Sequence, residues 1–155
     1  MPVTTPVTGP SPSLTNCTAG NRLAALPEDV GQLAQLRELH LMRNELVSLP
    51  SALGDLTRLR RLDLQDNRLV SLPASLGNLA ALTDLNLRNN ALAALPDSVG
   101  NLRNLRTLDL RANRLIKLPP TLGDLPQLEK LDLRWTKVAP PWLAQLEQRG
   151  CTVFT

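Results

Sequence analysis

The chain has 155 residues, a length that suits a single domain. Its 17 Lys and Arg against 14 Asp and Glu give a net charge of +3, too small and too mixed to indicate a nucleic-acid or membrane partner. Aromatic residues make up 2% of the chain, and it has one His and two Cys, so few side chains could stack on bases, ligate metals or act as nucleophiles. We therefore expect no enzymatic activity, no cofactor, no metal and no bound nucleic acid. No apolar run approaches ~18 residues, which argues against membrane insertion.

Residues 1–20 are rich in Pro, Thr, Ser and Gly and contain few large apolar side chains. Such a composition cannot form a packed core, so the segment is predicted to be a flexible N-terminal tail or a weak cap. When the 23-residue Leu pattern of the following residues is projected back by one unit, Ser13, Asn16 and Thr18 stand where Leu would be expected. A degraded strand around residues 14–18 and an open edge are both compatible with this segment, and we favour a poorly ordered cap.

Residues 21–138 repeat themselves every 23 positions. The clearest unit, residues 59–81, reads LRRLDLQDNRLVSLPASLGNLAA and generalises to LxxLxLxxNxLxxLPxxLGxLxx. Three residue types mark the period: Asn21, Asn44, Asn67, Asn90 and Asn113; Pro27, Pro50, Pro73, Pro96 and Pro119; and Gly31, Gly54, Gly77, Gly100 and Gly123. No insertion interrupts the spacing, so each position of the unit is expected to occupy an equivalent place in a stack of like elements.

Each unit predicts a short strand followed by a return segment. LxxLxL ends with apolar residues two apart, which is typical of a strand with one buried face, and successive strands joined by so long a return can pair only in parallel. The Pro ends the strand pairing and starts a short helical turn, and we expect the Gly to ease the turn that returns the chain. The Asn after each strand is expected to bond to the backbone of neighbouring turns, so that stacked Asn side chains form a structural spine.

The repeat resembles that of the leucine-rich repeat proteins, and its LPxxLGxL half is similar to the 23-residue Ras-group subclass found in plant intracellular, animal scaffold and bacterial proteins. The resemblance covers roughly residues 21–154. It implies an α/β solenoid, a right-handed horseshoe with a parallel sheet on the concave face and short 3-10 or α segments on the convex face. It also implies binding to other macromolecules, mostly proteins.

Residues 139–155 are predicted to form a C-terminal cap that consists of an amphipathic helix and a final strand. A Pro pair suits the start of the helix, and Gly150 suits the position just after its end. Phe154 stands 23 residues, one full repeat, after Leu131, and the repeat therefore predicts a buried strand position for it. Trp142 and Phe154 are therefore both expected to be buried in the cap.

The two cysteines, Cys17 and Cys151, lie near opposite ends of the predicted stack. Five or more strands spaced ~4.8 Å apart would separate them by over ~20 Å, whereas the Cα atoms of a disulfide lie ~4.4–6.8 Å apart. We therefore expect two unpaired thiols, which fit a reducing compartment, and a cytoplasmic location.

Five positions of LxxLxLxxN point toward the concave side or its rim, and the repeat aligns each of them into a column across the sheet. The fifth position carries mostly acidic residues and the seventh mostly Arg. Two interpretations stay open. In the first, the acidic and Arg side chains form exposed ion pairs that keep the polar face in register and contribute only ~0–1 kcal/mol each. In the second, they form a charge-patterned surface that is complementary to a partner. The candidate partner-binding residues are Met42, Asp63, Arg88, Asp109, Arg111, Asp132, Arg134 and Trp135.

Trp135 stands at the rim position where other units carry smaller or polar residues, and Trp and Arg are frequent at interface hot spots. It is equally compatible with packing over the C-terminal helix as part of the cap. Met42, at the opposite end, is either a lesser apolar contact or an incidental edge residue. Five strands present roughly 500–600 Å² of concave surface, less than the ~800 Å² that a standard interface buries on each partner, which favours a small or transient partner.

His40 is interpreted as a solvated strand residue, and the three Asp of the fifth column as paired with Arg rather than with Ca²⁺. The sequence thus predicts a non-enzymatic protein–protein interaction module that binds a protein or peptide through its concave face and C-terminal rim. We expect a monomer, and weak self-association stays open as an alternative. The alternative is a bacterial type III-like translocated effector, secreted into a host cell, or the substrate-recognition domain of one. The tail resembles the leaders of such effectors, and 14 Arg against 3 Lys fit a GC-rich bacterial source.

Overall fold

The computed structural model describes residues 15–17 and 20–155, so most of the predicted N-terminal tail lies outside the described residues. Along this part of the chain, three-residue strands alternate with 3-10 turns, and an α-helix precedes the last strand. The strands are β1 (Thr15–Cys17), β2 (Glu38–His40), β3 (Arg61–Asp63), β4 (Asp84–Asn86), β5 (Thr107–Asp109), β6 (Lys130–Asp132) and β7 (Thr152–Phe154). The 3-10 turns are η1 (Glu28–Gln32), η2 (Ser51–Asp55), η3 (Ala74–Asn78), η4 (Asp97–Asn101) and η5 (Pro120–Asp124), and the helix is α1 (Leu143–Gln148).

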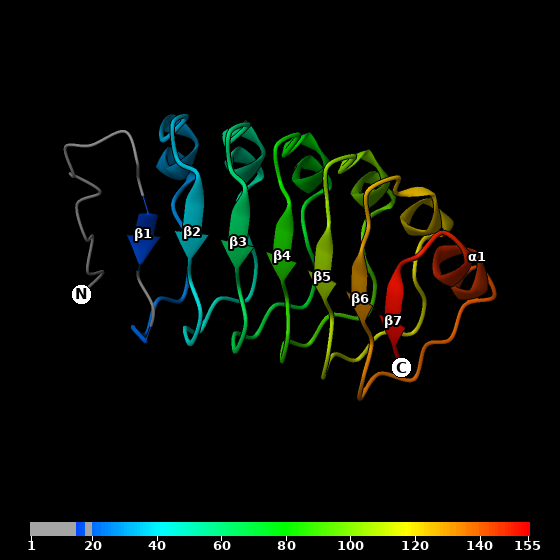
Figure 1. Ribbon diagram of the computed structural model, residues 1–155. Helices are drawn as coiled ribbons and strands as arrows, with labels where there is room; N and C mark the ends of the chain where they lie inside the picture. Colours follow the sequence, from blue (N-terminus) through cyan, green and yellow to red (C-terminus); the bar gives the residue numbers. More distant parts are fainter. Residues whose placement is uncertain (1–14, 18–19) are drawn as a thin grey trace.

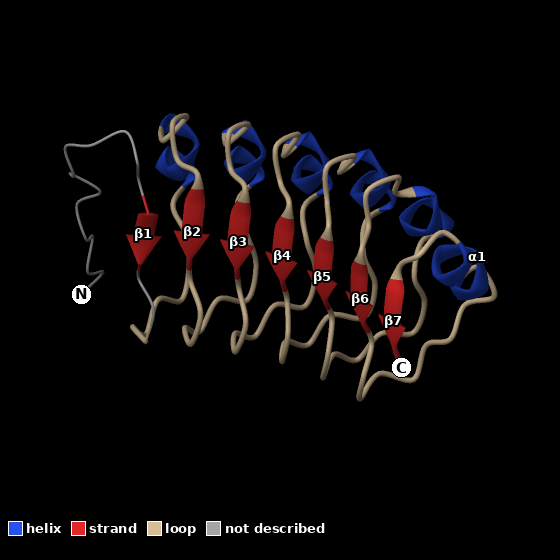
Figure 2. Ribbon diagram, viewed as in Figure 1, coloured by secondary structure: helices blue, strands red, loops and turns tan. Residues whose placement is uncertain are grey.

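The strands form one parallel sheet in chain order from β1 to β7. Figures 1 and 2 show the strands along one wall of the molecule and the 3-10 turns with α1 along the other. Neighbouring strands from β1 to β6 pair at an offset of one full repeat, so that Leu39 lies beside Leu62 and Leu62 beside Leu85. The solenoid and its parallel register, predicted from the repeat, are confirmed.

Leu side chains fill the space between the two walls. In one unit, Leu62, Leu64, Leu69 and Leu76 are each at most 1% exposed. The seven Leu of residues 59–81 contribute ~1.5–3 kcal/mol each when buried, roughly 10–20 kcal/mol in all. Ordering the 23 residues of the unit costs ~1–2 kcal/mol each, which is more, so a single unit cannot fold alone. Contacts between neighbouring units therefore stabilise the stack.

The recurring Asn forms the predicted spine. Asn67 Nδ2 donates to the carbonyl oxygens of Leu64, at 3.0 Å, and of Leu41 in the preceding unit, at 2.9 Å. Its Oδ1 accepts the backbone N–H of Leu46 at 3.1 Å. The same three contacts recur one and two units further on. Each Asn thus satisfies buried backbone groups of two adjacent units, which is a structural role.

The recurring Gly has a different role from the one expected. None of the five takes a positive φ, so the expectation that Gly eases the returning turn is wrong. Instead, adjacent 3-10 turns approach too closely for a side chain: a Cβ on Gly54 would lie 2.6 Å from the carbonyl oxygen of Ser75, and one on Gly77 would lie 2.8 Å from Ser98 Cβ. Gly therefore permits the tight packing of the convex wall.

α1 and β7 form a cap, but β7 is shifted by one residue from the predicted alignment. Phe154 pairs with Asp132 rather than with Leu131, because α1 returns the chain in one residue fewer than a 3-10 turn does. Phe154 is consequently 36% exposed, and the prediction that it is buried is wrong. Trp142 is half-buried against the core, and a Cβ on Gly123 would lie 3.1 Å from its ring.

β1 and β7 are the two edges of the sheet, which places Cys17 and Cys151 at opposite ends of the stack. Cys151 is a free and buried thiol, and burial raises its pKa. Among the described residues, every helix is too short or too polar to span a lipid bilayer.

Candidate functional site

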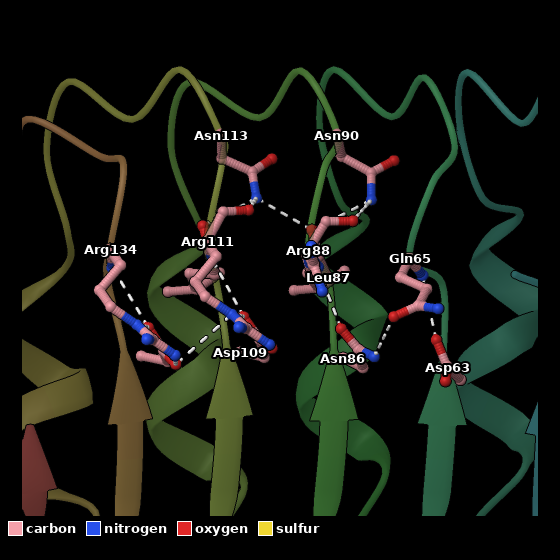
Figure 3. Close-up of polar contacts among 12 residues, drawn as sticks. Asp63, Gln65, Asn86, Leu87, Arg88, Asn90, Asp109, Arg111, Asn113 and Arg134 are labelled. Carbon is pink, nitrogen blue, oxygen red and sulfur yellow. Dashed lines mark hydrogen bonds and ion pairs between the residues drawn. The ribbon is translucent and has the colours of Figure 1, made fainter. Parts of the chain in front are cut away.

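The predicted residues of the acidic and Arg columns lie together across the concave face (Figure 3). Each acidic residue ends its strand, and each Arg follows two positions after a strand end. With the amides Gln65 and Asn86 between them, they form a line that we call the polar row. It consists of Asp63, Gln65, Asn86, Arg88, Asp109, Arg111, Asp132 and Arg134.

The strand-ending residues of the polar row also hold the backbone. Asp109 Oδ1 accepts the backbone N–H of Arg111 at 3.1 Å, and Asp132 Oδ1 accepts that of Arg134 at 3.2 Å. The equivalent bonds exist at the ends of β3 and β4. Side chains of Asp and Asn commonly bond in this way at turns. Sequence reasoning missed this role. Asn86 was the available signal, because it lacks the charge of the acidic column but keeps a side-chain oxygen that can accept a backbone N–H.

The residue after each of these bonds has an unusual backbone. At the eighth position of five units φ lies between 53° and 61°, in the left-handed region: Arg43, Asp66, Asn89, Ala112 and Trp135. Asn and Asp tolerate this conformation, whereas other residues with a Cβ are strained in it by roughly 1–2 kcal/mol. The absence of Gly at this position concealed the conformation from sequence reasoning.

Asp132 is the buried centre of the C-terminal half of the polar row. Its carboxylate side chain is 2% exposed and lies 2.8 Å from Arg134 Nη2 and 3.4 Å from Arg111 Nε. Burial alone would raise the pKa of Asp132, but the hydrogen bonds from Arg134 and the charges of both arginines outweigh it and hold the pKa below its ordinary value. Hydrogen bonds to Asp109 and to Asp132 raise the pKa of Arg111 and of Arg134, respectively. Arg111 and Arg134 are thus committed to pairs within the chain.

Two aromatic side chains lie at the C-terminal end of the concave face. Trp135 is 68% exposed, and its ring centre lies 6.0 Å from the guanidinium carbon of Arg88 and 5.8 Å from that of Arg134. The ring of Phe154 lies 5.3 Å from Lys130 Nζ and 5.3 Å from the guanidinium carbon of Arg134. These distances allow cation–π contacts. We call these five residues the aromatic cluster; sequence reasoning missed Phe154 because of the shift of β7.

The N-terminal end of the concave face is separate from the aromatic cluster. Met42 follows β2, is half-buried, and accepts the backbone N–H of Gly20 at 3.0 Å through its carbonyl oxygen. Strands β3 to β5 lie between Met42 and the strand that precedes Trp135. His40 Nε2 lies 3.3 Å from Glu38 Oε2. The structure therefore places Met42 in the unit next to Asp63, whose carbonyl oxygen accepts the N–H of Leu41 at 2.8 Å, and separates it from Trp135 and the aromatic cluster.

An open hollow of about 300 Å³ runs along the concave face between β2 and β6. Charged and hydroxyl side chains line it, among them Arg61, Asp84, Thr107 and Lys130. In the part of the chain that the structure describes, no three His, Cys, Asp or Glu gather as metal ligands. The face can offer hydrogen bonds, ion pairs and aromatic surface to a polar segment.

Two family models match the chain, one described as leucine rich repeat over residues 19–69 and one as leucine-rich repeat region over residues 74–148. Together they span the stack of strands described above. The chain is a leucine-rich repeat protein. Leucine-rich repeats generally mediate protein–protein interactions and are generally non-enzymatic. A search of the curated proteins found no match to this leucine-rich repeat protein.

Solved structures of other leucine-rich repeat proteins share the fold. A leucine-rich repeat protein of Leptospira interrogans is 31% identical, with a TM-score of 0.68, over 87% of this chain and 40% of that one. The leucine-rich repeat domain of the type III effector XopL is 36% identical, with a TM-score of 0.68, over 76% of this chain and 43% of that one. A third structure is the ectodomain of the plant receptor kinase GASSHO1/SCHENGEN3 from Arabidopsis thaliana in complex with CASPARIAN STRIP INTEGRITY FACTOR 2. It is 38% identical, with a TM-score of 0.71, over 79% of this chain and 16% of that one. This leucine-rich repeat protein therefore spans less than half the length of each.

Proposed function

We propose that the chain is a non-enzymatic recognition module that binds a protein or peptide through the C-terminal half of its concave face. The observation that carries the proposal is Trp135, which is 68% exposed and lies between two guanidinium groups at the rim. Exposed Trp and Arg side chains are the residues that most often dominate the binding energy of protein interfaces. Phe154 extends the same surface.

The backbone of Trp135 supports a binding role over a stabilising one. Its φ of 61° lies in the left-handed region, where a bulky residue is strained. The equivalent positions in the third and fourth strand units carry Asp66 and Asn89, which suit that conformation, and Asn89 Nδ2 donates to Asp66 at 2.8 Å. Stability alone would favour Asn here, so a Trp that is also largely exposed is best explained by a partner.

We expect Trp135→Asn to leave the free energy of unfolding unchanged or raised by up to about 1 kcal/mol, because relief of the strained backbone offsets the loss of two exposed cation–π contacts. The same substitution should strongly reduce capture of the partner from a lysate of the source organism. Chemical denaturation and quantitative pull-down measure the two effects. Arg43→Asn, at the same backbone position of the β2 unit and away from the aromatic cluster, is the control for backbone relief and should keep capture. A clear loss of stability with capture intact would instead assign Trp135 to the cap.

A second candidate function is favoured by the 36% identity to the effector domain. In this proposal the module recognises a host protein after translocation from a bacterium, and residues 1–14 serve as the leader. Deleting residues 1–14 leaves β1 in place, so it separates export from folding. Export that is lost while the thermal unfolding profile is kept supports the effector role; unchanged export rules out a leader in this segment.

A reducing compartment forms part of the main proposal. Cys151 is a buried free thiol, and burial raises its pKa, which lowers its reactivity at neutral pH. Cys17 stands on the opposite edge strand and cannot pair with it. A module of this kind needs no disulfide, because its continuous Leu core holds the units together.

A further inference from the structure

The charges of the polar row are balanced differently in its two halves. In β5 and β6, an Asp ends the strand and an Arg follows two residues later. Arg111 binds the carboxylate of Asp109, and Arg134 binds that of Asp132. Arg111 also reaches Asp132 at 3.4 Å, which links the two pairs. Each charge in this half is therefore neutralised within the chain, leaving little gain from pairing with a partner.

β3 and β4 break this pattern in opposite senses. Asp63 is followed by Gln65 rather than Arg, and Arg88 is preceded by Asn86 rather than Asp. Asn86 Nδ2 donates to Gln65 Oε1 at 3.0 Å, so an amide pair lies between the two charged residues (Figure 3). Among the described residues, neither Asp63 nor Arg88 forms an ion pair, so the expectation that the three Asp of the fifth column pair with Arg is wrong for Asp63.

Both charged groups are half-buried on the concave face, where a partner of opposite sign would gain more than at a fully exposed site. The guanidinium of Arg88 lies against the ring of Trp135, although the two residues belong to units that are two strands apart. The unit between them carries only Ala112 at the rim. An acidic group bound to Arg88 would therefore lie next to the exposed face of an aromatic ring.

We infer that the partner binds as an extended segment that crosses the strands, with an acidic side chain on Arg88, an apolar or aromatic side chain on Trp135 and a basic side chain on Asp63. This inference rests on the proposed function and names the chemistry of its ligand. Arg88 lies one strand across from Asp63, at a spacing of ~4.8 Å, and two residues further along the strand direction, at ~3.3 Å each. The two side chains are therefore anchored about 8 Å apart, which an extended chain spans in about two or three residues. The specificity of the face then comes from the two units that depart from the Asp and Arg pattern.

The test uses the full chain, immobilised, and a phage-displayed library of random dodecapeptides. The wild type should enrich peptides with an acidic residue near an aromatic or large apolar one and a basic residue on the other side. Binding of one enriched peptide, followed by fluorescence anisotropy, should weaken about tenfold in Arg88→Gln, because a charge-assisted hydrogen bond is lost. Asn86→Asp retains Arg88 but places an Asp carboxylate two residues before it, as Asp109 stands before Arg111. Arg88 should then pair within the chain, and binding of the same peptide should weaken about as much as in Arg88→Gln.

Arg103→Gln is the matched control, because Arg103 is exposed between η4 and β5, outside the polar row, and it should bind the peptide as the wild type does. Failure of the wild type to enrich any peptide would overturn this inference of an extended segment, whereas the proposed function, which includes folded partners, is decided by the capture experiment with Trp135→Asn. Enrichment of peptides without a preference for acidic residues would overturn this inference and leave the proposed function standing. The same conclusion follows if Arg88→Gln and Asn86→Asp bind the peptide as tightly as the wild type does. Thermal unfolding of each variant confirms that the comparison is made between folded proteins.

Discussion

Replacing Asn113 by Ala should lower the free energy of unfolding by about 3–5 kcal/mol, because it leaves two buried backbone groups without partners. Asn113 Oδ1 accepts the N–H of Leu92 at 3.1 Å, and its Nδ2 donates to the carbonyl oxygens of Leu110 and Leu87, both at 2.9 Å. The next unit carries Thr136, whose hydroxyl bonds to its own unit instead. Leu110 therefore has no second side-chain donor among the described residues.

Asn90→Ala provides the matched comparison. The carbonyl oxygens of Leu64 and Leu87, to which Asn90 donates, each accept a second bond from the Asn of a neighbouring unit. Only one N–H is then left unpaired, and we expect a smaller loss of about 2 kcal/mol. Urea denaturation of both variants measures the difference. Equal losses, or a larger loss for Asn90→Ala, would contradict the overlapping spine.

Gly77→Ala should lower the free energy of unfolding by about 3 kcal/mol, since the added methyl group meets backbone that cannot move aside freely. A Cβ at this position would overlap the carbonyl oxygen of Ser98 and lie 2.8 Å from Ser98 Cβ. To accept it, η3 and η4 would have to separate, which loosens the packing of two neighbouring units and of the Leu side chains beneath them.

Asn78→Ala is the control for Gly77→Ala, because Asn78 is the next residue of the same 3-10 turn and is exposed. Its effect should stay within about 0.5 kcal/mol, as for most surface substitutions. Thermal and urea unfolding measure both variants. A Gly77→Ala protein as stable as the wild type would show that the turns have room for a side chain at this position.

The strict period of the repeat predicted the parallel stack, the Leu core and the Asn spine, because each of these depends only on which residue types recur at which spacing. Leu39, Leu62 and Leu85 lie side by side as the spacing requires. The same rule failed where the period itself changed: α1 shortens the last return by one residue, and Phe154 moves onto the concave face. Spacing arguments cannot detect a change of that kind in advance.

Other features depend on three-dimensional contacts that residue types alone do not determine. The columns placed Asp109, Arg111 and Asp132 on one face, but their commitment to internal pairs follows from side-chain conformations and burial. The left-handed backbone of Trp135 was hidden because the column contains no Gly. The close approach around Gly77 is likewise a property of the packed convex wall.

The two halves of the polar row differ in how their charges are balanced. The strand-ending side chains of both halves hold the backbone. The fully paired half also neutralises the buried carboxylate of Asp132, whereas Asp63 and Arg88 keep charges that the chain does not neutralise. Replacing Arg111 or Arg134 would therefore disturb the fold as well as any partner, and binding tests are better directed at Arg88 and Trp135.

The most direct test of recognition at the C-terminal half of the concave face uses the indole N–H resonances of the two Trp side chains. A ¹⁵N-labelled chain is titrated with an enriched peptide or captured partner, and Trp142→Phe assigns the two signals. Trp135 lies exposed beside Arg88, whereas Trp142 packs in the cap beside Gly123. We expect the Trp135 signal to shift and the Trp142 signal to stay in place. A shift of Trp142 with Trp135 unmoved would place the partner on the cap and contradict the proposed site.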